Sequence, residues 1–429
     1  MKFDFAKEEG KPENLLPFWI ADMDFPVAAC ITEALQKRVD HAIYGYSEAK
    51  PSYFKAVHDW FLHNFQWDTK PEWLVKTPGV VPAINLAVKA LTKENEAVLI
   101  HRPVYHPFTF AIENNKRKLV NSPLILKNGR YEIDFADMER KITENEVKLA
   151  IFCSPHNPAG RVWTKEELET YADICIRHDV KIVSDEIHAD FTYPGHKHIP
   201  FAAINEKAAE QVILCTAPSK TFNIAGLQVS NIWIPNPEIR AAFQQELAAF
   251  GYDHVNVMGL IAGEAAYKGA GEWLAVVKEY IGNNLDYTRQ FLKEKLPKLK
   301  LIEPEGTYLA WIDCNGYGLS DTEMEQKLLN DAKIWVNMGS MFGPEGNCFI
   351  RLNLACPKKT LEQGLEQLYQ GLENKIFCLH VRGFHPFPTY FRKSIFIISC
   401  LFYPFITKYI SELKNAENFF RKVTLHFLM

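Results

Sequence analysis

The chain has 429 residues, 47% of them hydrophobic, so it is long enough for two or three domains with a large buried core. Its net charge of −4 and isoelectric point near 6.4 argue against a nucleic-acid-binding surface. The nine cysteines form no Cys-x-x-Cys pair, and the N-terminus lacks the apolar stretch of a signal peptide. These features predict a cytoplasmic protein without a disulfide framework.

Strands and helices alternate from about residue 75 to residue 235, which predicts a parallel sheet with helices on both faces. The Pro78–Pro82 segment breaks the chain before a helix predicted over residues 83–91. Thr164 and Glu167 form the capping-box pattern of a helix that runs to His178.

A long amphipathic helix is predicted from Gly271 to Leu296, where it could bridge two domains. Short strands over residues 300–302, 307–312 and 348–353 surround a helix predicted over residues 321–331. This part of the chain therefore predicts a small C-terminal α+β domain.

Three buried-strand patterns in the middle of the chain run into polar residues: Leu149–Cys153 precedes Asn157, Val180–Val183 precedes Asp185, and Val212–Cys215 precedes Lys220. Open α/β sheets bind ligands at the carboxyl ends of their strands, so these side chains are expected to meet at one edge of the sheet. A lysine that can form a Schiff base and an aspartate that can pair with a pyridinium nitrogen are the groups that pyridoxal 5′-phosphate (PLP) requires.

Several motifs in the same order then resemble the MalY/PatB group of C–S lyases, which are cystathionine β-lyase-like PLP enzymes of fold type I. The motifs are Leu16–Phe25, Tyr44–Tyr46, Gly79–Ile84, Asp185–His188 and Phe349–Pro357, together with the trio Asn157, Asp185 and Lys220. The resemblance covers roughly Met1 to Lys375.

The resemblance implies an α/β fold with a large domain built on a mostly parallel seven-stranded sheet, and a small α+β domain. The domain boundaries are then an N-terminal segment over residues 1–46 that joins the small domain, a PLP-binding domain over 47–270, and a small domain over 271–375. A homodimer with a shared active site is also implied.

The site residues follow from this resemblance and from the strand-end pattern. Lys220 is the Schiff-base lysine and the group that takes the substrate Cα proton, and Asp185 pairs with the pyridine nitrogen. The resemblance implies that Asn157 contacts the phenolic oxygen of the cofactor and that Tyr105 stacks on its ring. His188 stands where many aminotransferases have a tyrosine. The phosphate contacts are expected from Gly79, Val80, Val81, Ser219 and Thr216, and from Tyr46 at the phosphate of the partner subunit. Arg351 is the expected clamp for the substrate carboxylate.

The implied reaction is β-elimination from cystathionine or another cysteine S-conjugate, giving a thiol, pyruvate and ammonia. A class I/II aminotransferase is the alternative enzyme, because the same cofactor chemistry can end in reprotonation instead. An additional regulatory binding role is a third possibility. No metal site is expected, since His196 and His198 have no third ligand at suitable spacing.

Residues 376–429 depart from the family pattern. They are rich in phenylalanine and basic residues and contain only two acids, Glu412 and Glu417. The apolar run from Ile395 to Ile406 is too short to span a bilayer, which makes a membrane role unexpected. A frameshifted or read-through tail, a poorly packed extension and a membrane-surface anchor remain open, and the short N-terminus also favours an error in the gene sequence.

Overall fold

The computed structural model describes residues 2–252 and 254–373. The chain divides into two units, Met1–Asn374 and Lys375–Met429, and every described residue belongs to the first unit. The hypotheses on the tail over residues 376–429 therefore lie outside the described residues. Within the described part, no helix is both long enough and apolar enough to cross a membrane.

A seven-stranded sheet forms the larger layer of the first unit, in the order β2-β10-β9-β8-β7-β3-β4. Strand β10 is antiparallel to both of its neighbours, and the other neighbouring strands are parallel. The predicted mostly parallel seven-stranded sheet is thus confirmed. Its strands are β2 (Leu74–Thr77), β3 (Ala97–Ile100), β4 (Lys118–Asn121), β7 (Leu149–Cys153), β8 (Lys181–Asp185), β9 (Val212–Thr216) and β10 (Ser230–Trp233).

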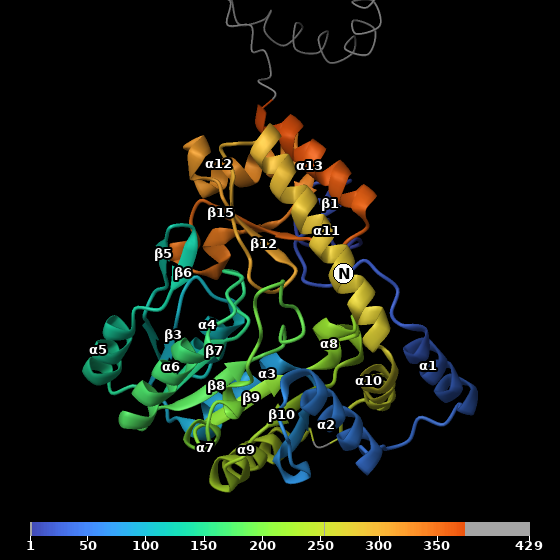
Figure 1. Cartoon of the computed structure of the whole chain (residues 1–429), viewed down its shortest axis with the longest axis vertical. Helices are drawn as coiled ribbons and strands as arrows, with labels where there is room; N and C mark the ends of the chain where they lie inside the picture. The colour runs from blue at the N-terminus through green and yellow to red at the C-terminus, as the bar shows by residue number, and fades with distance from the viewer. Residues whose placement is uncertain (1, 253, 374–429) are drawn as a thin grey trace, which may run out of the picture. The chain divides into compact units, whose positions relative to one another are not determined.

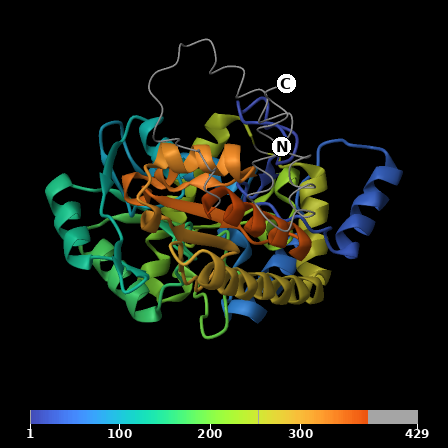
Figure 2. The same cartoon turned by 90° about the horizontal axis from the view of Figure 1, so that it is seen from above.

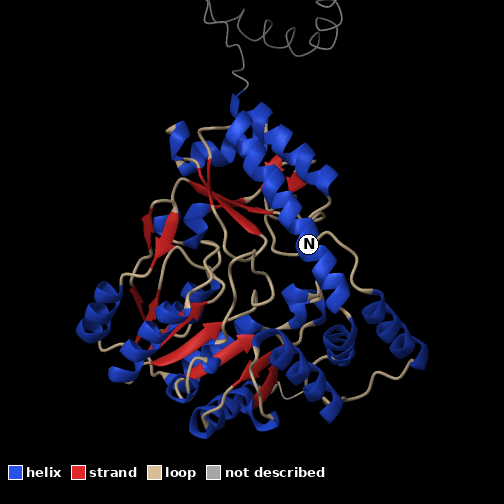
Figure 3. Cartoon of the chain, viewed as in Figure 1, coloured by secondary structure: helices blue, strands red, loops and turns tan. Residues whose placement is uncertain are grey.

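Both faces of this sheet are buried, because side chains alternate along each strand and every face carries apolar residues. In β7, Ala150 and Phe152 belong to one hydrophobic cluster and Ile151 and Cys153 to the other. Figure 3 shows the helices on either side of the strands. The cluster with Ile151 takes in α3 (Val80–Leu91), α4 (Pro107–Glu113) and α9 (Pro237–Phe250), and the other takes in α2 (Pro51–Phe65), α5 (Phe135–Asn145), α6 (Lys165–Arg177) and α10 (Val257–Gly269).

The predicted capping box of α6 is confirmed: the Thr164 hydroxyl accepts the Glu167 N–H, and the Glu167 carboxylate accepts the Thr164 N–H. Helix α3 begins at Val80, earlier than the sequence predicts, with Pro82 inside its first turn. Proline is tolerated there because the N–H groups of a first helical turn have no intrahelical acceptor.

A smaller antiparallel sheet, in the order β11-β12-β15-β14, forms the second layer. Its strands are β11 (Lys300–Ile302), β12 (Leu309–Asp313), β14 (Asn337–Met338) and β15 (Phe349–Asn353), flanked by α12 (Asp321–Gln326) and α13 (Lys358–Glu373). The helix predicted over residues 321–331 has two parts: α12, which ends at Gln326, and a π-helical turn over Lys327–Asp331. The N-terminal strand β1 (Leu16–Pro17) pairs with β13 (Ile334–Trp335) beside this sheet.

The predicted long helix is α11 (Gly271–Lys295). It contacts α10 at one end and α13 and β11 at the other, so it connects the two sheets, as Figure 1 shows. Helix α1 (Ala29–His41) lies at one edge of the described part in Figure 2. The remaining short elements are the hairpin β5 (Ile125–Lys127) and β6 (Arg130–Glu132), α7 (Glu206–Ala209) and α8 (Pro218–Thr221).

Candidate active site

The three predicted strand ends lie next to one another. Strand β8 pairs in parallel with β7 on one side and with β9 on the other, so their carboxyl ends share one edge of the sheet. Asp185 is the last residue of β8, Asn157 follows β7, and Lys220 lies in α8 just after β9. Residues far apart in sequence are thereby placed at one site.

A cavity of about 380 Å³ opens at this edge of the sheet, and it brings together every predicted site residue except Thr216 and Tyr46. Its lining includes Gly79, Val80, Val81, Tyr105, Asn157, Asp185, His188, Ser219, Lys220 and Arg351, together with Trp19, Ile20, Ala21, His106, Asn337 and Met341. This volume lies within the range of small-molecule pockets.

The Lys220 side chain is held by the N-terminal segment. Its Nζ donates to the Ala21 carbonyl at 2.8 Å and lies 3.3 Å from Asp22 Oδ1. Burial lowers the pKa of Lys220, and the neighbouring Asp22 carboxylate opposes that shift. A lysine with a lowered pKa spends more time as the neutral amine, which is the form that attacks carbonyl carbons and accepts protons.

Asp185 is 4% exposed. Its Oδ1 accepts the backbone N–H of Ile187 at 3.2 Å, and burial raises the pKa of the carboxyl to about 7, against the attraction of Lys220. A buried carboxylate needs a cation or strong donors to stay ionised. A protonated pyridine nitrogen has both properties, so Asp185 fits that end of PLP.

Arg351 lies on β15 and is 5% exposed. It donates to Asn157 Oδ1 at 3.0 Å, to the Trp19 carbonyl at 2.9 Å and to Asn337 Oδ1 at 2.5 Å. All of these acceptors are neutral, and its Nε is buried without a partner among the described residues. Burial lowers the pKa of Arg351 to about 10, so it stays cationic at neutral pH. An uncompensated buried guanidinium fits the carboxylate of an amino-acid substrate.

Two rings complete the walls. Tyr105 lines the cavity, and its backbone N–H donates to the Asn157 carbonyl at 3.1 Å, which ties the predicted stacking ring to the end of β7. His188 is buried with its ring against the edge of Tyr308, and its Nδ1 has no partner among the described residues. Burial lowers the pKa of His188 to about 3, so its imidazole is neutral at physiological pH.

The N-terminus of α3 faces the same cavity through Gly79, Val80 and Val81. Gly79 is the N-cap residue, so the first backbone N–H groups of the helix have no intrahelical acceptor. With the nearby Ser219 hydroxyl, such a helix end suits a phosphate. The cavity therefore offers groups that fit both PLP and an amino-acid substrate: Lys220, Asp185, Arg351, the Tyr105 ring and the N-terminus of α3.

Thr216 and Tyr46 are the two predicted residues outside the cavity. The Thr216 hydroxyl donates to the Asn231 carbonyl at 2.8 Å and accepts from Trp233 Nε1 at 3.2 Å, so it connects β9 to β10 rather than facing the phosphate cradle. Its role as a phosphate ligand stays a prediction. Tyr46 is 96% exposed in the segment after α1, and its role at a partner subunit stays a prediction.

The sequence analysis assigned no role to several lining residues. Trp19 and Ala21 contribute backbone carbonyls to Arg351 and Lys220, and Asn337 orients Arg351 through its side chain. Trp19 and Ala21 lie in the Leu16–Phe25 motif, but every residue type has a backbone carbonyl. The sequence therefore cannot indicate which carbonyls contact Arg351 and Lys220. Asn337, on the short strand β14, carried no recognisable pattern.

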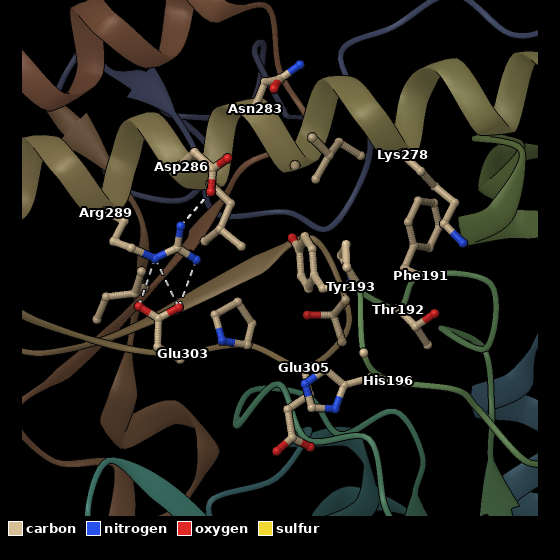
Figure 4. A pocket seen from close by; sticks show the side chains of 18 of the residues that line it. Phe191, Thr192, Tyr193, His196, Lys278, Asn283, Asp286, Arg289, Glu303 and Glu305 are labelled. Atoms are coloured by element: carbon tan, nitrogen blue, oxygen red, sulfur yellow. Dashed lines mark hydrogen bonds and ion pairs between the residues drawn. The ribbon is translucent and has the colours of Figure 1, made fainter.

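A larger cavity, of about 1110 Å³, contains none of the predicted residues. It lies between the Phe191–His196 segment, α11 and the Glu303–Thr307 segment (Figure 4). There Arg289 pairs with Asp286 at 2.5 Å and with Glu303 at 2.9 Å, so this cation is already compensated. In the cavity of about 380 Å³, by contrast, Arg351 faces the site without a carboxylate partner among the described residues and lies with Lys220 and Asp185.

Comparison with known proteins identifies the family of the chain. Residues 14–368 match the family model described as aminotransferase class I and II. Cystathionine beta-lyase PatB of Bacillus subtilis (strain 168) is 42% identical over 87% of this chain and 96% of its own length, and protein MalY of Escherichia coli (strain K12) is 34% identical over 86% and 95%. The crystal structure of cystalysin from Treponema denticola, which contains PLP, superposes with a TM-score of 0.84 at 38% identity, covering 87% of this chain and 95% of cystalysin.

The chain therefore belongs to the class I and II aminotransferase family, and within it to the group that includes PatB and MalY. The resemblance inferred from its motifs is confirmed.

Proposed function

We propose that this protein is a PLP-dependent C–S β-lyase, which cleaves cystathionine or other cysteine S-conjugates. In this reaction the conjugate and one water give a free thiol, pyruvate and ammonium. One observation carries the proposal: Lys220, Asp185 and Arg351 converge on one cavity in a chain 42% identical to a cystathionine β-lyase.

Bound PLP supplies an electron sink for the pair released when the substrate loses its Cα proton. Arg351 binds the substrate carboxylate and so fixes the orientation of Cα and Cβ. Lys220, whose pKa is lowered by burial, takes the Cα proton at Nζ. Asp185 would pair with the protonated ring nitrogen of bound PLP, and the thiolate leaves from Cβ.

Trp19, Ile20 and Tyr105 contribute apolar surface to the lining of this cavity. Burial keeps His188 neutral at physiological pH, so it adds no second positive charge beside Lys220.

An assay without added keto acid separates lyase from aminotransferase. We expect the purified protein with PLP and L-cystathionine to release pyruvate and free thiol in equal amounts, because elimination needs no second substrate. Pyruvate formation that requires a keto acid, with no thiol release, would assign the protein to the aminotransferases instead.

We also propose a homodimer in which Tyr46 reaches the partner's phosphate site. Ile43, Tyr44 and Tyr46 are 63%, 56% and 96% exposed in one segment, and a second subunit would bury this apolar run. A particle with the mass of one chain in light scattering would refute the homodimer.

A cytoplasmic location is proposed from the scattered cysteines, and cell fractionation tests it.

Residues 376–429 are expected to be dispensable for this activity. The described active-site residues all lie within the first unit of the chain, and the family model ends at residue 368. A chain that ends at Lys375 should bind PLP and retain the thiol-release rate of the full chain within about twofold. A shortened chain that folds, as judged by circular dichroism, but is inactive would show that the tail takes part in function.

A further inference from the structure

The N-terminal segment over residues 20–25 is fixed to both layers of the fold. Asn223, which follows α8, donates to two backbone carbonyls of this segment at 3.0 Å each. Asn353, the last residue of β15, donates to two more of its carbonyls at 2.7 Å each. The backbone around Asp22, in the middle of the segment, is therefore held in place from two sides.

Asp22 is the only carboxylate within hydrogen-bond distance of the Lys220 amine in the described part of the chain, with Oδ1 at 3.3 Å from Nζ. The neighbouring Ala21 carbonyl accepts from the same amine at 2.8 Å and from the Tyr308 hydroxyl at 2.8 Å. Burial raises the pKa of Tyr308, so this hydroxyl stays a neutral donor. The free amine of Lys220 thus has two oxygen acceptors on one short segment, and one of them is charged.

The other charged and titratable groups around the Lys220 amine do not replace Asp22. Arg351 on β15 repels the ammonium form, and Asp185 at the end of β8 attracts it more weakly than Asp22 does. His188, which follows β8, is kept neutral by burial, because its pKa falls to about 3. Since Asp185 would pair with the cofactor nitrogen, Asp22 is the carboxylate that remains to stabilise a positive charge on Nζ.

We propose that Asp22 is a positioning residue for Lys220: it holds the free amine against the N-terminal segment and stabilises the proton that this amine takes from the substrate Cα. The inference rests on the proposed lyase function and adds a residue to it. When the proton leaves Cα, its electron pair stays on the substrate and Nζ becomes an ammonium group. Burial of Lys220 disfavours that charge, and a carboxylate 3.3 Å away favours it.

Attachment of PLP to the cofactor-free protein reports on the Lys220 amine without turnover. Only the neutral amine attacks the PLP carbonyl, so the rate of attachment rises with pH until the amine is fully deprotonated. Asp22→Asn keeps an oxygen acceptor on the segment and removes the charge.

We expect the midpoint of this attachment profile to move to lower pH in Asp22→Asn, because the variant lacks the attraction that raises the pKa of Lys220. Where the wild-type rate still rises with pH, the variant should attach PLP about 3- to 10-fold faster, a modest effect because the Asp22 side chain is 42% exposed and solvent screens its charge. At high pH the two proteins should reach the same rate.

The same substitution is expected to slow turnover. A less basic amine takes the Cα proton more slowly, so Asp22→Asn should lower kcat for thiol release from L-cystathionine by about 3- to 10-fold. Faster attachment of PLP together with slower turnover is the signature of a charge effect on Lys220. Loss of structure would slow both.

Asp24→Asn is the matched control, since Asp24 lies in the same segment but pairs with Lys2 at 2.8 Å. It should leave the attachment profile and kcat unchanged. Asp22→Glu keeps the charge and should restore most of the wild-type profile and turnover.

An attachment profile of Asp22→Asn that coincides with the wild-type profile would overturn the inference. Equal losses of attachment rate at every pH and of kcat would overturn it as well, since they indicate a structural role. A wild-type protein that attaches PLP but releases no thiol would refute the lyase function, while a shifted profile in Asp22→Asn would still support the hold of Asp22 on Lys220.

Discussion

Lys220→Ala is expected to lower kcat for thiol release by roughly four orders of magnitude or more, because it removes both the attachment point of the cofactor and the base at Cα. Lysine is also the group that the Ala21 carbonyl and Asp22 hold in place, so alanine leaves these acceptors empty. Thiol release is measured under saturating PLP and substrate.

Lys278→Ala is the control for this experiment. Lys278 is a second lysine whose pKa is lowered by burial, but it lines the other cavity, and its replacement should preserve turnover. Borohydride treatment of the wild-type protein with PLP should attach the cofactor to the peptide that contains Lys220. Attachment to Lys278 or another lysine would refute the assignment.

The strand-end residues could be predicted because the geometry of a parallel sheet is simple. Neighbouring parallel strands end at the same edge, so an apolar run followed by Asn157, Asp185 or Lys220 indicates a common site without knowledge of side-chain packing. The phosphate cradle at Gly79 could be predicted for a similar reason, since it depends on a helix start.

The hydrogen bonds of Thr216, whose role at the phosphate stays a prediction, show a limit of reasoning from the sequence. Side chains alternate along a strand, and the pattern within β9 places Thr216 on the same face as Leu214. On that face Trp233 of the neighbouring strand is close enough to bond its hydroxyl. The order of strands β9 and β10 decides this contact, and the order of strands is not encoded locally.

Backbone contacts mark a second limit. The Ala21 and Trp19 carbonyls hold Lys220 and Arg351, but any residue type offers the same carbonyl. Asn337 acts through its side chain, but it lies outside the motifs, on a short strand without a recognisable pattern. Such positions become visible only when the small sheet is folded beside the large one.

Asp185→Asn is expected to retain PLP but to lower kcat by at least two orders of magnitude. An amide cannot neutralise the positive ring nitrogen. The enzyme therefore loses a preorganised electrostatic interaction that stabilises the transition state by roughly 3 kcal/mol. Asp190→Asn is the control: burial also raises the pKa of Asp190, but its carboxylate accepts from Trp60 and Thr221 outside the cavity. Near-normal turnover in Asp185→Asn would refute the role.

The same substitution should have the opposite effect on the stability of the cofactor-free protein. Burial raises the pKa of Asp185 from 3.8 to about 7, so the unfolded chain ionises this group at lower pH than the folded chain does. The folded state is therefore penalised as pH rises above 4, and the penalty is complete above pH 7, on the order of a few kcal/mol. Without PLP, Asp185→Asn should exceed wild type in the free energy of unfolding by urea at pH 8, with a difference that shrinks toward pH 4. A difference in the free energy of unfolding that is independent of pH would show that burial does not raise the pKa of Asp185 in the folded protein.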